Sequence, residues 1–244
     1  MKLTNEQYHA DREHVSKTWL DKINKSPAHL YEYLNEEPKE KTEALIFGGL
    51  LHEMVLEQHH ENYVLPPKIN RRTKDGKVEW TDFVASIGNK QIITQEMLDK
   101  AEKMRLSIFQ NKFAKSLLRK GDPEQTVFYK DESGVLCKAR ADWVSENGTV
   151  DLKTTLDASH EGFKRALRKY RYNVQAAHYE QGFNVGEFIF IAIEKEPPYC
   201  CAVYRTSASS FYEGKEERKR NLETYIECKE KNEWPGYPEI IQEV

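Results

Sequence analysis

Asp142, Asp151 and Lys153 are the residues whose types and spacing are best suited to chemistry. They fall within residues 138–155, where polar and apolar side chains alternate as they do in half-buried strands. Asp is depleted inside strands, so two aspartates beside a lysine break a local rule, as functional sites often do. The two carboxylates could converge on one cation, and the lysine could hold a water or a phosphate oxygen beside it. The alternative is a solvated strand face with an ordinary salt bridge.

The relative positions of these three side chains depend on the turn of a predicted β-hairpin. Asn147-Gly148 favours a two-residue turn, because a type I′ turn needs positive φ at both central residues. With this turn, Asp142 faces Lys153, and Asp142 and Asp151 are diagonal neighbours about 7–8 Å apart at the backbone. The other face of the hairpin is apolar, and we expect it to lie on a core: Ala139, Ala141, Trp143, Val150 and Leu152.

Helical and strand patterns alternate along the rest of the chain. Helices are predicted over residues 5–36 (in two pieces that meet at Ser26-Pro27), 42–58, 95–109, 111–120, 160–170, 173–184 and 208–232. Strands are predicted over 124–130, in the hairpin, over 187–194 and over 199–206. Residues 59–93 are the least regular part. This order predicts an α/β fold with a central mixed β-sheet flanked by helices.

Length and charge set the outer limits of the interpretation. A chain of 244 residues suits one domain. We expect a mainly helical part over 1–121, a sheet and core over 122–206, and a helix with a tail over 207–244. The formal charge of −3 excludes a uniformly basic surface, so any DNA site must be a local patch. We see no signal peptide and no apolar run that could span a bilayer, and the four cysteines suit a reducing cytoplasm.

His52 lies in the most apolar predicted helix, beside Gly48 and Gly49. Two consecutive glycines inside a helix cost about 1 kcal/mol each relative to alanine, so they indicate that a backbone or a ligand approaches closely. His52 is then either a core histidine with satisfied hydrogen bonds or a neutral imidazole that binds a metal.

Basic residues cluster in two segments. The segment after the hairpin is the densest, with aromatic residues between its cations, and its candidates for contacts with a DNA backbone are Lys164, Arg165, Arg168 and Arg171. The second segment is a basic turn over residues 71–77, which contains Arg71 and Arg72. A solvated helix face and a solvated loop are the respective alternatives.

Four short motifs in this order carry a resemblance to a known family. Asp142 followed by Asp151-Leu152-Lys153 resembles the PD-(D/E)xK nuclease motif. Gln175-x-x-x-Tyr179 and Gly48-x-x-x-His52 resemble the Q-x-x-x-Y and G-x-x-x-H motifs of its phage-exonuclease branch. Over nearly its whole length the chain resembles the C-terminal nuclease domain of the exodeoxyribonuclease VIII group of phage and prophage exonucleases, and more distantly lambda exonuclease.

The resemblance implies a restriction-endonuclease-like core with an N-terminal helical elaboration. It also implies a Mg²⁺-dependent exonuclease, with Mn²⁺ able to substitute, that degrades the 5′-ended strand of linear double-stranded DNA. Such enzymes typically form rings around DNA in the bacterial cytoplasm and work with a single-strand annealing protein in recombination. The four cysteines lack the spacing that relatives with an iron–sulfur cluster use, so we expect no such cluster.

Roles for individual residues follow from the resemblance and from the chemistry of phosphodiester hydrolysis. The expected metal ligands are His52, Asp142, Asp151 and the carbonyl of Leu152. Lys153 is expected to orient the attacking water, help to deprotonate it and stabilise the transition state. Gln175 and Tyr179 would position the cut strand or Lys153. Glu124 falls near the start of a strand, where an ordinary edge glutamate is the main interpretation and an outer metal ligand the alternative.

Two other functions remain open from the sequence. One is a structure-specific or restriction endonuclease of the same superfamily, which would differ in cutting closed circular DNA. The other is a DNA-binding module that has this fold but does not cut. The intact set of Asp142, Asp151 and Lys153 argues against the second, because a protein that does not cut has no need of three charges on one strand face.

Overall fold

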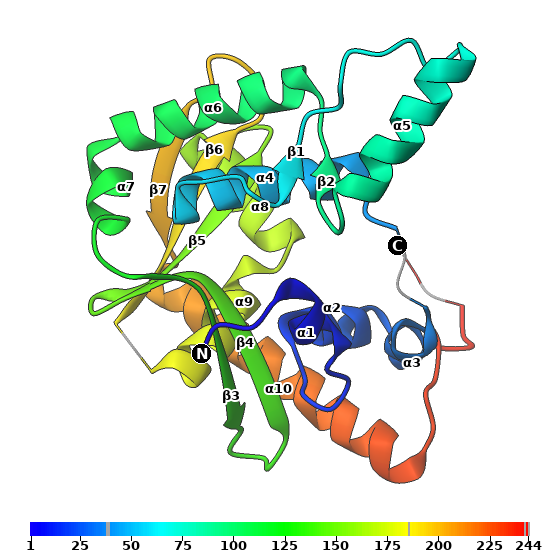
Figure 1. Ribbon diagram of the computed structural model, residues 1–244. Helices are drawn as coiled ribbons and strands as arrows, with labels where there is room; N and C mark the ends of the chain where they lie inside the picture. Colours follow the sequence, from blue (N-terminus) through cyan, green and yellow to red (C-terminus); the bar gives the residue numbers. More distant parts are fainter. Residues whose placement is uncertain (38–39, 185, 242, 244) are drawn as a thin grey trace.

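A five-stranded mixed sheet forms the centre of the protein (Figure 1). This computed structural model describes residues 1–37, 40–184, 186–241 and 243. The strand order is β3-β4-β5-β6-β7, in which β5 and β6 are parallel and the other neighbours are antiparallel. The strands span Asp122–Lys130 (β3), Leu136–Ser145 (β4), Gly148–Thr155 (β5), Glu187–Glu194 (β6) and Cys201–Arg205 (β7). The predicted mixed sheet is therefore confirmed.

Helices precede, interrupt and follow the sheet. Those before it are α1 (Asn5–Ala10), α2 (Lys17–Lys25), α3 (Pro27–Asn35), α4 (Glu43–His52), a π-helical turn η1 (Glu53–Glu57), α5 (Lys74–Ser86), α6 (Gln95–Gln110) and α7 (Lys112–Leu117). The crossover between β5 and β6 contains α8 (His160–Lys169) and α9 (Tyr172–Phe183), and α10 (Ala208–Lys231) follows β7. Ser26 is the N-cap of α3 and Pro27 its first residue, as the sequence predicts.

The sheet is packed between two groups of helices. One apolar cluster joins α4, η1, α6 and α7 to the sheet through Trp143, Val150 and Leu152. A second cluster joins α8 and α9 to the sheet through Ala139 and Ala141. The five apolar residues of the hairpin are all buried as predicted, but they divide between the two clusters and do not pack on a single core. Among the described residues, no helix is both long enough and apolar enough to cross a bilayer.

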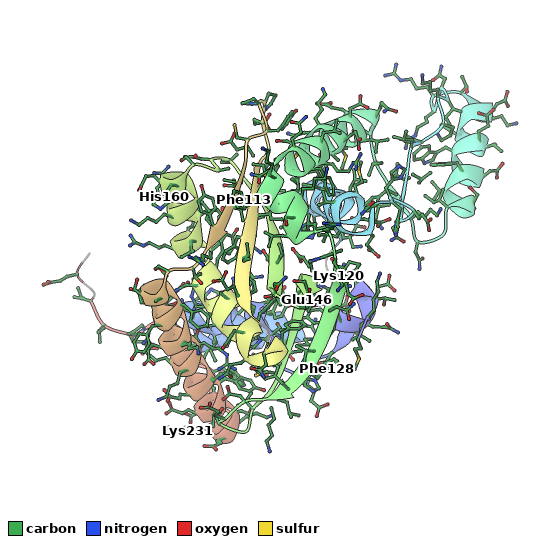
Figure 2. All side chains as sticks on the ribbon, turned by 90° about the vertical axis from the view of Figure 1, so that its left-hand side faces the viewer. Phe113, Lys120, Phe128, Glu146, His160 and Lys231 are labelled. Atoms are coloured by element: carbon green, nitrogen blue, oxygen red, sulfur yellow. The ribbon has the colours of Figure 1, made fainter. Side chains whose placement is uncertain are left out.

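The predicted hairpin turn is wrong by one residue. Ser145 pairs with Gly148, so Glu146 and Asn147 form the turn and Gly148 is the first residue of β5. Glu146 lies in this turn beside Lys120, with 3.9 Å between the carboxylate and the ammonium (Figure 2). A Cβ at residue 148 would lie 2.1 Å from a backbone oxygen of β6, so the glycine serves a close approach of two strands.

The irregular region over residues 59–93 contains a helix that the sequence analysis missed. Thr73 caps α5, and its side chain accepts a hydrogen bond from the amide of Gly76. This glycine in the first turn lowers helix propensity, which is why the segment has the pattern of a basic loop. Two short parallel strands, β1 (Tyr63–Val64) and β2 (Gln91–Ile92), pair with each other and bring together the two ends of the segment that contains α5. Figure 1 shows α5 standing away from the sheet.

The helix that carries His52 is interrupted directly after this residue. α4 ends at His52 and continues as the π-helical turn η1, a form that is rare in proteins and frequent at functional sites. A Cβ at Gly49 would meet the side-chain hydroxyl of Tyr63 at 2.3 Å, so the group that approaches this glycine is a tyrosine side chain and not the predicted backbone or ligand. At Gly48 a Cβ would meet no described atom within 4 Å.

Candidate active site

Asp142 lies where two strands of the sheet stop pairing. β4 and β5 pair only next to their turn, from Ser145–Gly148 to Trp143–Val150. On the side of Trp143–Val150 that lies away from the turn, where Asp142 stands, the two strands no longer pair. The carboxylate of Asp142 fills the position of a neighbouring strand there, because its Oδ2 accepts a hydrogen bond from the amide of Leu152 at 2.7 Å. A charge-assisted bond of this kind fixes the side chain firmly.

His52 reaches the same point from α4. Its Nε2 lies 3.1 Å from the carbonyl oxygen of Leu152, which can only accept a hydrogen bond, so Nε2 carries the proton. Nδ1 is then an acceptor, and it lies 3.6 Å from Oδ2 of Asp142. Two acceptor atoms face each other in this arrangement, which a cation between them would stabilise.

Glu124 completes this group from β3. Its neighbours Pro123 and Gln125 pair with Trp143 and Ala141, so Glu124 lies opposite Asp142. Its backbone has φ of 53°, a left-handed conformation that is uncommon for a residue other than glycine and that costs on the order of 1–3 kcal/mol.

One ligand atom from each of His52, Glu124 and Asp142 lies within 4.8 Å of the other two. The alternative role of Glu124, as a metal ligand, is therefore the one that its position favours.

Asp151 lies on β5 beside this group and is 2% exposed. Its Oδ1 accepts a hydrogen bond from the side-chain amide of Gln175 on α9. Its Oδ2 lies 2.7 Å from Nζ of Lys153, without the geometry of a hydrogen bond. Among the residues that the structure describes, this buried oxygen has no hydrogen-bond partner, and such an atom is suited to a metal.

The electrostatics of the site reflect crowded carboxylates. Burial raises the pKa of Asp142 above its ordinary value, and the carboxylate of Asp151 raises it further. Burial also raises the pKa of Glu124, with a contribution from Asp142. Burial lowers the pKa of His52, which keeps the imidazole neutral. Burial alone would lower the pKa of Lys153, but Asp151 and Asp142 outweigh it and raise that pKa.

The donor set fits a hard divalent cation. Three carboxylates and a neutral imidazole converge with two cationic side chains, Lys153 and Arg140, the second of which pairs with Glu124 at 2.8 Å. With all three acids ionised, as a bound cation would favour, one negative charge is left over at the site. Oxygen-rich sets of this kind suit Mg²⁺ and Mn²⁺.

The carbonyl oxygen of Leu152, also predicted as a ligand, accepts the hydrogen bond from His52. Only its second lone pair would remain for a metal.

The two motif residues on α9 lie beneath the carboxylates. Gln175 contacts Asp151 directly, so what it positions is this carboxylate. Tyr179 is buried in the cluster under β4, where its ring packs edge-on against Phe188. Burial, with contributions from Tyr8 and from the carboxylates of the site, raises the pKa of Tyr179 well above its ordinary value. Tyr179 therefore remains a neutral phenol.

The predicted DNA contacts divide into exposed and buried residues. Lys164, Arg165 and Arg168 are exposed on α8, and Arg165 pairs with Asp157 at 3.0 Å. Figure 2 shows His160, the first residue of this helix, at the rim of the molecule.

Arg171 differs from the other three. Its guanidinium donates hydrogen bonds to Glu217, to the carbonyl of Leu20, to Asp21 and to Asn221. These contacts favour a structural role for Arg171 in place of the predicted DNA contact.

Arg71 and Arg72 lie in the turn before α5 and are exposed. The guanidinium of Arg71 lies 3.8 Å from the ring centroid of Trp80 on α5, so one face of this guanidinium already makes a cation–π contact within the protein. Both arginines belong to the turn that precedes α5, and Figure 1 shows this helix away from the sheet.

The sequence analysis assigns no role to two residues that lie near the site. Arg140 is half-buried and pairs with Glu124, and its alternation with Asp142 along β4 is the signal that places both on one face. Tyr172 lies under Lys153, whose Nζ is 4.8 Å from its ring centroid. No short motif in the sequence indicates this second contact.

The geometry agrees with what a comparison of protein families finds. The family described as "PDDEXK-like domain of unknown function (DUF3799)" matches residues 16–244. The chain belongs to this family. The matched segment contains each of the site residues described above, from His52 to Tyr179. The PDDEXK-like family thus confirms the predicted superfamily and, with the mixed sheet, the restriction-endonuclease-like fold class.

One solved structure adds support at the level of the fold, and two others are similar over most of this chain at a lower structural score. A protein of Eubacterium rectale, provisionally named an exonuclease, has 16% sequence identity and a TM-score of 0.64, with 98% of this PDDEXK-like chain and 96% of that chain covered. A phage-related exonuclease of Haemophilus somnus has 11% identity, a TM-score of 0.40 and coverages of 93% and 99%. An alkaline exonuclease of Laribacter hongkongensis has 15% identity, a TM-score of 0.36 and coverages of 78% and 96%. No protein with a curated function matches in sequence.

Proposed function

We propose that the protein is a metal-dependent nuclease, and more closely an exonuclease that acts on linear double-stranded DNA. The observation that carries the proposal is the group formed by His52, Glu124 and Asp142. Beside this group lies a buried oxygen of Asp151, which is paired with the ammonium of Lys153 and has no hydrogen-bond partner among the described residues. Acidic ligands with a lysine next to them are what hydrolysis of a phosphodiester needs. The names of the similar structures agree with this activity.

The chain's own residues supply binding and orientation. A bound divalent cation would polarise the phosphate and make a bound water more acidic. His52, Glu124, Asp142 and Asp151 would hold that cation. The ammonium of Lys153 lies close enough to Asp151 to orient a water beside it and to stabilise negative charge on the phosphoryl oxygens.

Two further interactions keep these groups in place. Gln175 fixes the carboxylate of Asp151, and Arg140 fixes Glu124. Supporting contacts of this kind hold metal ligands in their productive orientation. The raised pKa keeps Lys153 protonated in the metal-free protein. A protonated lysine can orient the attacking water but cannot accept a proton from it, so we favour the orienting role over the predicted help with deprotonation of the water.

The finer parts of the proposal rest on the family resemblance stated from the sequence. They are Mg²⁺ as the natural cation with Mn²⁺ as a substitute, degradation of the 5′-ended strand, and 3′ single-stranded tails that feed recombination. A single-strand annealing protein as partner, a homo-oligomeric ring and the bacterial cytoplasm belong with them. The exposed cations of α8 support contact with DNA, because they follow directly on the strand that carries Asp151 and Lys153.

The test is digestion of a linear duplex labelled separately at each 5′ end and internally, with Mg²⁺ or with EDTA, beside closed circular DNA. Asp151→Asn removes the charge and keeps the oxygen that Gln175 contacts. Asp99→Asn, at an exposed position on α6, is the matched control. We expect progressive loss of label from the 5′ ends, intact circles, an inactive Asp151→Asn variant and an active control.

Each other outcome would change the assignment. Cutting of closed circles would indicate an endonuclease of the same superfamily. A folded protein that retards DNA but cuts none of these substrates would indicate a binding module. Full Mg²⁺-dependent cleavage by Asp151→Asn would remove the proposed site.

A further inference from the structure

An aromatic pair adjoins the lysine of the candidate active site. Nζ of Lys153 lies 4.8 Å from the ring centroid of Tyr172, and this ring stacks on that of Tyr170 at 5.6 Å with 27° between the planes. Tyr172 is half-buried, whereas Tyr170 is 49% exposed. The pair therefore extends from the site to the surface of the molecule.

The link between α8 and α9 holds the two rings in this position. Tyr170 and Tyr172 flank Arg171, whose backbone is left-handed with φ of 53°. This conformation turns the chain sharply enough for two residues at i and i+2 to stack on each other. The guanidinium of Arg171 is anchored to α2 and α10, and the ammonium of Lys17 donates a hydrogen bond to the carbonyl of Tyr170 at 2.8 Å. The stacked rings of Tyr170 and Tyr172, here called the platform, are thus fixed before any ligand binds.

The buried rings of this aromatic group pack in the core, whereas Tyr170 is exposed. Phe163, which comes from the same aromatic and basic segment, is buried and stacks on Tyr204 at 4.6 Å with 8° between the planes. Tyr172 packs on Phe163 and Phe190, so these rings belong to the core. Tyr170 is the ring of this group that offers a broad surface to solvent. Core packing does not account for its position.

The surroundings of Tyr170 favour a nucleotide as its ligand. Arg168 and Lys169 precede it and are exposed, so the segment that carries the ring attracts phosphates. Nζ of Lys169 lies 5.3 Å from the Tyr170 centroid. Such an exposed cation–π contact is worth about 0.5–1 kcal/mol, and stacking of a base on an aromatic ring about 1–3 kcal/mol. A base can therefore displace the lysine from the ring.

We propose that Tyr170 stacks on an unpaired base of the strand whose phosphate is bound at Lys153. The inference rests on the proposed nuclease function and adds to it a site for a separated strand. Bases in a duplex are already stacked on their neighbours, so the platform selects nucleotides that have left the duplex. The protein would then hold the cut strand by a base as well as by its backbone.

The experiment uses duplexes in which 2-aminopurine replaces one of the last three bases, in the 5′-ended or in the 3′-ended strand. Stacking quenches the fluorescence of this base. Ca²⁺ replaces Mg²⁺ during the measurement, and cleavage with Mg²⁺ is assayed separately on the same preparations. The variants are Tyr170→Ala, Tyr170→Phe and Tyr170→Leu. Tyr31→Ala is the matched control, because Tyr31 on α3 is also 49% exposed but packs against Trp234.

We expect the 2-aminopurine of the bound DNA to stay quenched, as it is in the free duplex, in the wild type, in Tyr170→Phe and in Tyr31→Ala, because each keeps an aromatic ring at residue 170 on which the separated base can stack. Tyr170→Ala and Tyr170→Leu are expected to lose the quenching and to bind the duplex about tenfold more weakly. Quenching that persists in Tyr170→Ala, or a wild type without quenching, overturns the inference. Quenching that depends on Tyr170 in a protein that cuts no DNA supports the platform and removes the proposed nuclease function.

Discussion

Asp142 accepts a hydrogen bond from the backbone amide of Leu152 at 2.7 Å, and the carbonyl of the same residue accepts one from His52. Both backbone groups of Leu152 on the β4 side are thus used by side chains of the site. The sheet opens between β4 and β5, and the opening exposes the polar groups that hold Asp142 and His52. The site is a consequence of interrupted strand pairing.

The first prediction concerns the charge of Asp142. Asp142→Asn keeps an oxygen for the Leu152 amide but removes one of three crowded carboxylates. Metal-dependent cleavage should fall more than about 100-fold, because loss of an outer-shell contact alone typically costs 10–100-fold. The metal-free variant should be at least as stable as the wild type, because burial and Asp151 raise the pKa of Asp142 to about 8, and asparagine removes the free-energy cost of protonating this acid on folding.

Thermal denaturation with and without Mg²⁺ gives the measurement for this variant. Binding to the folded state raises the Tm of the wild type, and the rise should be absent in Asp142→Asn. Asp99→Asn serves again as control. The same Mg²⁺-induced rise in both proteins would show that Asp142 is not a ligand.

The second prediction separates Lys153 from the metal ligands. Lys153→Met removes the ammonium 2.7 Å from Asp151 without removing a ligand. The value of kcat should fall on the order of 10²–10³-fold, the size of effect seen when one donor to a developing anion is lost. The Mg²⁺-induced rise in Tm should remain.

The control for Lys153→Met is Lys231→Met, at the far end of α10 (Figure 2), which should be fully active. Loss of the Mg²⁺-induced rise in Lys153→Met would mean that the lysine organises the metal site itself.

The face of the hairpin that carries the site could be predicted even though its turn was misplaced. Side chains alternate with a period of two, and both turns pair an even-numbered residue of β4 with an odd-numbered residue of β5. Asp142 and Asp151 therefore share a face in either register. The observed register, continued by one residue, places Asp142 opposite Asp151 in place of Lys153.

Other features lay beyond local pattern. The left-handed backbone of Glu124 is imposed by the surrounding sheet, and nothing in its own sequence context signals it. The π-helical turn after His52 continues an ordinary helical pattern, so periodicity does not reveal it. Arg171 has the same side chain as its exposed neighbours, and only the fold brings Asp21, Glu217 and Asn221 around it.

The third prediction contrasts Arg168 with Arg171. Arg168→Ala should leave the free energy of unfolding unchanged. It should weaken the salt dependence of DNA binding, so that the slope of log K against log salt concentration becomes smaller in magnitude by about 0.9 for one lost phosphate contact. Arg171→Ala should lower the free energy of unfolding by about 3 kcal/mol, because it removes four hydrogen bonds, among them those to Glu217 and Asn221.

Urea denaturation and fluorescence anisotropy from 50 to 200 mM salt, about the range over which such contacts are resolved, measure the two quantities. Equal stabilities of Arg168→Ala and Arg171→Ala would contradict the structural role of Arg171.

The fourth prediction concerns His178, which lies in a buried polar network on α9. Nε2 donates to the carbonyl of Lys138 at 3.0 Å, and Nδ1 accepts a hydrogen bond from Nε of Arg218 at 3.2 Å. The ring is therefore neutral. Burial, with a contribution from Arg218, lowers the pKa of His178 to about 3.

The sign of the resulting pH dependence follows from this shift. Because the unfolded chain binds the proton more tightly, the stabilising contribution of His178 is complete above pH 6.5 and is lost as the pH falls towards 3. Between pH 7 and pH 5 this loss lowers the free energy of unfolding by about 2 kcal/mol. His178→Gln should be less stable at pH 7, but its free energy of unfolding should fall by about 2 kcal/mol less over that interval. Urea denaturation at pH 7, 6 and 5 measures both proteins, and parallel curves for the two would show that His178 does not titrate on unfolding.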